Sequence, residues 1–144
     1  MTHWATKYIG IDWEAGAQGV GASGAPAFDC WSFFRHVQAV HFGIEVPIIS
    51  ASSYDDAGEI VSLVNGHAER GRWASLPIPI GRKEGDGVIV HRPLHIGLWL
   101  AVDGGGVLHC VRGIGVIFTR DRVWPHSGFG RREFYRFNQL QVAC

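Results

Sequence analysis

Phe28-Asp29-Cys30-Trp31 begins the best-defined helix that the sequence predicts. Asp29 is a favoured N-cap residue, apolar residues recur after it at helical spacing, and Gly43 supplies a typical C-terminal stop. The apolar positions are Phe33, Phe34, Val37 and Val40. The pattern predicts a helix from Asp29 to Phe42 with one buried side, around which the rest of the chain folds.

Cys30 is the residue of chemical interest in this stretch. A thiol in the first turn of a helix lies near unpaired backbone N–H groups and the positive end of the helix dipole, and both favour the thiolate. We therefore expect a lowered pKa for Cys30 and alkylation at a lower pH than for an ordinary thiol. For a single cysteine, a small buried core residue is the commoner role. The nucleophile hypothesis thus depends on a base elsewhere in the chain.

The N-terminal half of the sequence is predicted to be helical. Residues 4–13 contain a short apolar segment long enough for one helical turn or more. A second helix is predicted to begin at 52–56, where acidic residues fill the first turn, and to end near Gly66 or Gly71. Residues 72–80 contain two prolines and are expected to be a connector.

The C-terminal half reads as a series of short strands joined by turns. The predicted strands are 87–92, 94–102, 106–112, 116–119 and 133–137. The Gly-rich turn at 103–106 predicts a hairpin between the second and third of them. Helices followed by strands indicate an α+β domain, in which the N-terminal helices pack on a C-terminal antiparallel β-meander.

Composition limits the classes of protein to which the chain can belong. The 144 residues suffice for one domain with a substantial core, so we expect a single domain over residues 1–144. The 13 basic and 13 acidic residues balance, which argues against a nucleic-acid binder. No apolar run approaches the ~20 residues of a membrane span, and the opening residues lack the apolar core of a signal peptide. Three cysteines without a CxxC pair and eight histidines without zinc spacing support neither a metal site nor a cofactor.

Two histidines on adjacent predicted strands are candidates for the base that Cys30 requires. His95 shares one face of its strand with Gly97 and Trp99. If the hairpin loop is 103–105, His109 lies opposite Trp99, about 13 Å from His95 along a flat strand, so that twist or a bulge would have to bring the rings together. A single strand histidine is more often structural, but a cysteine followed by two such histidines fits a nucleophile, a base and an orienting group.

Five short motifs occur in a fixed order along the chain: Tyr8-Ile-Gly-Ile-Asp-Trp13, Asp29-Cys30-Trp31, Gly85-Asp86, His95-Ile-Gly-Leu-Trp-Leu100 and Leu108-His109. Their order resembles that of NlpC-type cell-wall cysteine peptidases, which are papain-like enzymes that cut peptidoglycan stem peptides. The resemblance extends from about Tyr8 to Phe137, and Asp29-Cys30-Trp31 with Arg35 looks most like the phage tail-assembly branch.

The resemblance implies a papain-like fold and a Cys-His-His triad. By position, Cys30 would be the nucleophile, His95 the general base and His109 the residue that orients His95. The backbone N–H of Cys30 would help to hold the oxyanion. The residues expected around the oxyanion and the substrate cleft are Cys30, Asp29, Trp13 and Trp31.

The sequence departs from the family pattern in three places. Trp31-Ser32 stands where relatives have Ser-Gly or, in the phage branch, Trp-Gly, and this predicts crowding at a close helix contact. Trp13 stands where relatives tend to have a tyrosine, so a phenolic hydroxyl is missing. Residues 50–80 have no clear counterpart and are expected to be an extra or docking segment.

The resemblance therefore predicts a cysteine endopeptidase that cleaves peptidoglycan stem peptides. We expect it in a phage or phage-like virion, at the tail tip, with tail-tip or hub proteins as partners. It would be made in the host cytoplasm without a signal peptide and would act at the cell wall or in the periplasm. The alternative is a structural tail-tip plug or adaptor that keeps the fold with little or no activity. A papain-like acyltransferase or amidase is a third reading.

Overall fold

The computed structural model describes residues 3–46, 73–76, 81–91 and 94–137. The second predicted helix, which begins at 52–56, lies outside the described residues, as does the proposed docking segment 50–80 apart from 73–76. None of the helices in the described ranges is long and apolar enough to cross a membrane.

Helix α1 spans Cys30–Phe42, as the sequence predicts. The Asp29 carboxylate accepts a hydrogen bond from the Ser32 N–H at 2.7 Å, and Ser32 Oγ accepts one from the Asp29 N–H at 3.0 Å. Gly43 ends the helix in the left-handed region with φ 68°, which costs glycine little. Of the predicted apolar stripe, three residues are buried, but Val40 is 55% exposed.

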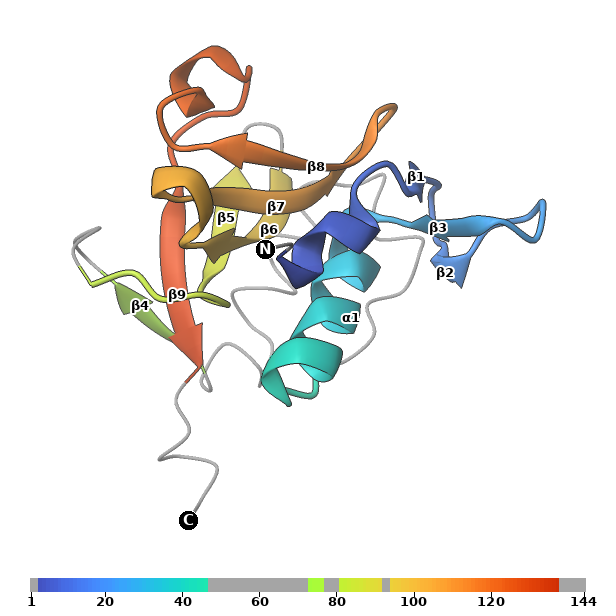
Figure 1. Cartoon of the computed structure of the whole chain (residues 1–144), viewed down its shortest axis with the longest axis horizontal. Coiled ribbons are helices and arrows are strands. Elements are labelled where there is room, and N and C mark those ends of the chain that lie inside the picture. Colours follow the sequence, from blue (N-terminus) through green and yellow to red (C-terminus); the bar gives the residue numbers. More distant parts are fainter. Residues whose placement is uncertain (1–2, 47–72, 77–80, 92–93, 138–144) are drawn as a thin grey trace.

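A small three-stranded sheet precedes α1 and positions its first residue (Figure 1). It contains β1 (Asp12–Trp13), β2 (Gln18–Val20) and β3 (Pro26–Phe28). Strand β3 pairs in parallel with β1 and antiparallel with β2, and it leads directly into α1. The predicted N-terminal helical segment is the short 3₁₀ helix η1 (Trp4–Tyr8).

The main sheet is antiparallel throughout, and α1 packs on two of its inner strands, Leu94–Leu100 and Gly106–Val111 (Figure 1). Its strands are β4 (Trp73–Leu76), β5 (Gly87–His91), β6 (Leu94–Leu100), β7 (Gly106–Val111), β8 (Gly115–Arg120) and β9 (Glu133–Phe137). Two further 3₁₀ turns, η4 (Val102–Gly104) and η5 (Trp124–His126), follow β6 and β8.

The strand order corrects two expectations. The order is β4-β9-β5-β6-β7-β8, so only β5 to β8 form the predicted meander, and β9 returns to pair with β5. The expected connector at 72–80 contains strand β4, which pairs with β9. Strand β4 forms its backbone hydrogen bonds with β9, a strand far along the sequence. The prolines that follow β4 give no local indication of that pairing.

The two faces of the sheet carry separate apolar clusters. Ile96, Leu98 and Leu100 of β6 face α1, whereas Trp99 lies in the cluster on the opposite face. The α1 side also includes Phe33, Phe34, Val37, Leu108, Cys110 and Val116. The opposite side includes Val88, Val90, Val107, Trp124 and Phe134. This alternation decides which side of the sheet each candidate site residue reaches.

Candidate functional site

Cys30 lies where the start of α1 meets β6. It is partly buried against the main core, and backbone hydrogen bonding from Ile96, the residue after His95, reaches its thiol. Burial, together with the Asp29 carboxylate, raises the pKa of Cys30 to about 12. The backbone groups of Ile96, Trp31 and Cys30 itself lower the pKa but are outweighed. The expected lowering of the Cys30 pKa by the helix start is therefore wrong for this structure.

His95 and His109 form a buried pair. His95 Nε2 lies 2.8 Å from His109 Nδ1, within hydrogen-bonding distance. His95 is 8% exposed and His109 is fully buried. Burial lowers the pKa of His95 to about 4 and that of His109 well below its usual range, with a further contribution from His95. Both rings are thus neutral at physiological pH.

The expected register between their strands is wrong, and the correction explains the contact. Trp99 pairs with Val107, not with His109. His109 instead lies across from Gly97, where an added Cβ would be 2.9 Å from His109 Cβ. Gly97 therefore leaves room for the His109 side chain, and neither strong twist nor a bulge is needed to bring the two rings together.

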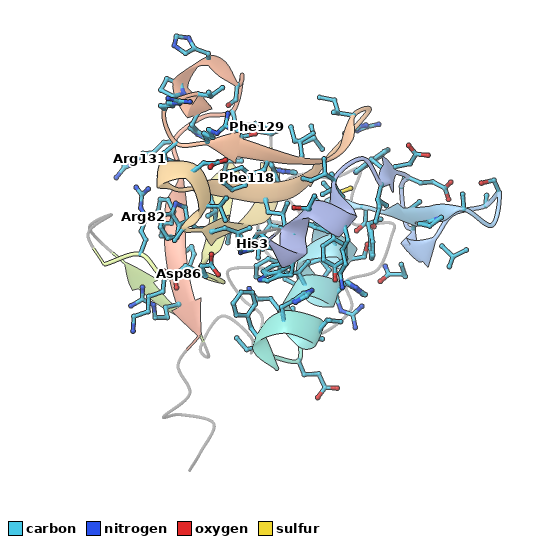
Figure 2. The ribbon with its side chains drawn as sticks, viewed as in Figure 1. His3, Arg82, Asp86, Phe118, Phe129 and Arg131 are labelled. Carbon is cyan, nitrogen blue, oxygen red and sulfur yellow. The ribbon has the colours of Figure 1, made fainter. Side chains whose placement is uncertain are left out.

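Thr119 and two aromatic residues complete the surroundings of the pair. His109 Nε2 lies 2.9 Å from Thr119 Oγ1 on β8. Phe129, on the segment between β8 and β9 (Figure 2), stacks on the His95 ring with centroids 4.8 Å apart, and Trp124 packs against His109. The sequence pattern did not single out Thr119 or Phe129. Strand alternation could have identified Thr119, because it pairs with Val107 on the same side of the sheet as His109.

Cys30 and the histidine pair lie on different sides of the main sheet. Cys30 packs with the core on the α1 side, whereas the His95 ring stacks with Phe129 on the opposite side. Within the described part of the chain, no hydrogen bond joins the Cys30 thiol to the His95 ring. The structure brings His95 and His109 together and places Cys30 against the backbone of the next residue, Ile96.

The other predicted cleft residues have clear structural positions. Asp29 is fully buried as the N-cap, and Trp31 is buried beside Phe34. Trp13 is partly buried next to Phe28 in the β1–β3 pairing, with the Arg112 guanidinium 5.4 Å from its ring centroid. Of these three residues, Trp13 is the one that retains exposed surface.

The Ser32 side chain forms specific hydrogen bonds at the start of α1. Its hydroxyl donates a hydrogen bond to the Ala17 carbonyl at 2.6 Å, while the same oxygen accepts from the Asp29 N–H. Ser32 therefore ties the first turn of α1 to the segment before β2 and fixes the position of Cys30.

Among the described residues, no group of three or more His, Cys, Asp or Glu side chains could hold a metal ion. Comparison of the whole chain with models of known protein families finds no match, and no curated protein matches it significantly.

The raised pKa of Cys30 predicts slow alkylation. The thiol is protonated at pH 7, so iodoacetamide should modify Cys30 slowly, and the rate should still be rising at pH 10. Asp29→Asn keeps an N-cap side chain but removes the carboxylate charge, so this variant should react faster at each pH. Peptide mass mapping follows Cys30 separately from the other cysteines. A plateau below pH 8 would contradict the assignment.

Proposed function

We propose that the chain is a papain-like cysteine peptidase of the NlpC type, which cleaves amide bonds in peptidoglycan stem peptides. One observation carries the chemical part of the proposal. A hydrogen-bonded histidine pair follows a cysteine at a capped helix start, in the chain order that the family motifs require, and the cysteine thiol contacts the backbone of Ile96, the residue after His95. The stem-peptide substrate and a place at a phage tail tip are supported by the motif resemblance.

Each residue then has a defined chemical role. His95 takes the Cys30 proton as the sulfur attacks the substrate carbonyl, and backbone N–H groups, including that of Cys30, hold the oxyanion. The C–N bond breaks as His95 returns the proton to the leaving amine, which leaves a thioester on Cys30. Water then attacks the thioester with His95 as base, releasing the carboxylic acid and the free thiol. His109 holds His95 in position through Nε2.

The neutral resting state decides how the thiol is activated. With the Cys30 pKa raised and the His95 pKa lowered, no thiolate–imidazolium pair exists before substrate binds. Proton transfer therefore accompanies the attack on the carbonyl instead of preceding it.

Release of muropeptides from purified sacculi tests the proposal. Cys30→Ala should lose activity by on the order of 10⁴-fold or more, as expected for removal of a nucleophile. Cys110→Ala is the matched control, because Cys110 is fully buried on the α1 side of the sheet and has no part in the mechanism. This control should keep its activity. Equal release by the wild type and Cys30→Ala would refute the catalytic role.

The raised Cys30 pKa and the buried histidine pair also suit the structural alternative, a tail-tip plug or adaptor with little activity. On that reading, particles carrying Cys30→Ala assemble and infect normally, whereas deletion of the protein blocks tail completion. The peptidase proposal instead requires Cys30→Ala to impair cell-wall penetration.

A further inference from the structure

The contact between His109 and Thr119 continues a buried line of polar atoms that begins at His95. The line runs from His95 Nε2 to His109 Nδ1 at 2.8 Å, and from His109 Nε2 to Thr119 Oγ1 at 2.9 Å. Thr119 is 8% exposed and belongs to the regular pairing of β7 with β8. Each contact needs one hydrogen, because a buried ring nitrogen without a partner is costly.

Only two arrangements of ring hydrogens satisfy both contacts when the rings are neutral. In the first, His95 Nε2–H donates to His109 Nδ1, and His109 Nε2–H donates to the Thr119 hydroxyl oxygen. In the second, the Thr119 hydroxyl donates to His109 Nε2, and His109 Nδ1–H donates to His95 Nε2. The first leaves the lone pair of His95 Nδ1 free, whereas in the second Nδ1 carries the ring hydrogen.

Only the first arrangement lets His95 act as a base without rearrangement. A proton taken up at Nδ1 leaves the Nε2–H donor in place, and both hydrogen bonds persist in the imidazolium. In the second arrangement the only ring lone pair of His95 is at Nε2, and it already accepts a hydrogen bond from His109. Protonation there would place two hydrogens between the same two nitrogens.

We propose that Thr119 is a positioning residue for the peptidase reaction proposed above, on which this inference rests. Its hydroxyl oxygen accepts His109 Nε2–H and so fixes His95 in the tautomer whose Nδ1 is basic. Thr119 touches neither the thiol nor the substrate and acts through His109. The stacked Phe129 ring further restricts rotation of the His95 ring.

Ring ¹⁵N NMR of the whole protein reads out the tautomers directly. In the wild type, His95 and His109 should both carry the ring hydrogen on Nε2. Thr119→Val keeps the shape but removes the acceptor, so both rings should shift to the Nδ1–H tautomer. Thr119→Ser, the matched control, should keep the wild-type pattern. Nδ1–H rings in the wild type, or unchanged rings in Thr119→Val, would overturn the role of Thr119.

Rates of sacculus hydrolysis distinguish a failure of this inference from a failure of the proposed function. Thr119→Val should lose on the order of 10²-fold in rate, within the range of general base catalysis, and Thr119→Ser only about 3-fold. An inactive wild type with Nε2–H rings would refute the proposed function while supporting the hydrogen arrangement. An active wild type with Nδ1–H rings would refute the role of Thr119 alone. If Thr119→Val does not fold, Nδ1–H rings in the wild type or in Thr119→Ser would still refute the role of Thr119.

Discussion

Gly97→Ala is expected to destabilise the fold by about 3 kcal/mol, the upper end of the usual range for overpacking. The added Cβ would lie 2.7 Å from Val107 Cγ1, 2.9 Å from His109 Cβ and 2.9 Å from the Leu108 carbonyl oxygen. A backbone carbonyl cannot turn aside as a side chain can, so strands β6 and β7 must separate where His95 meets His109. Urea denaturation measures the loss of unfolding free energy, and hydrolysis should fall with it.

Gly113→Ala is the control for this substitution. Gly113 has a φ of +79° but nothing within 4 Å of an added Cβ, so its cost of about 1 kcal/mol reflects backbone conformation alone. Gly97 has no such positive φ, and its cost is steric. Equal losses for the two variants would show that β7 does not approach Gly97 as closely as described.

Arg136→Ala is expected to cost about 3–5 kcal/mol, because it leaves a buried carboxylate without its partner. Asp86 is 3% exposed, and Arg136 binds it through Nε at 2.9 Å and through a terminal nitrogen at 2.7 Å. This contact raises the pKa of Arg136 further. Asp86 also accepts from the Lys83 N–H, and the neighbouring Gly85 carbonyl accepts from Gln38 of α1. Losing Arg136 therefore loosens the turn before β5, which contacts α1 through Gly85 and carries the Asp86 labelled in Figure 2.

Arg120→Ala is the control that tests whether burial of Asp86 causes the large loss of stability expected for Arg136→Ala. Arg120 pairs with Asp103 at 3.1 Å, but the two side chains are 44% and 58% exposed. An exposed pair contributes roughly 0–1 kcal/mol, so this variant should unfold close to the wild-type urea midpoint. A similar loss for Arg120→Ala and Arg136→Ala would argue against a desolvated Asp86.

The elements with local signals could be predicted from the sequence. Asp29 and Gly43 mark the ends of α1 through side-chain and backbone chemistry confined to a few residues. The C-terminal strands and the turn around Asp103 were likewise recognisable, and Asp103 adopts the positive φ of 50° that a tight turn requires. The order of Cys30, His95 and His109 could be read directly from the sequence.

Long-range geometry could not be predicted. The register of β6 against β7 depends on which residues form the turn, and the assumed loop placed His109 opposite the wrong residue. Strand β4 was missed because its partner β9 lies far along the sequence. The raised Cys30 pKa follows from burial by the whole fold and from Asp29, effects that outweigh the local helix start.

Strand β9 has a consequence for how the protein reaches this structure. Although it is the last described strand in the chain, it is an inner strand of the sheet, hydrogen-bonded to β4 on one side and β5 on the other. The hairpins of β5 to β8 can form from neighbouring residues, but β4 cannot join the sheet until 133–137 are in place. Folding is slowed because the entropic cost of closing such long loops arises before the strands make any stabilising contact. During synthesis, the edge of β5 therefore stays exposed until β9 pairs with it. Association with other chains is most favoured during this interval.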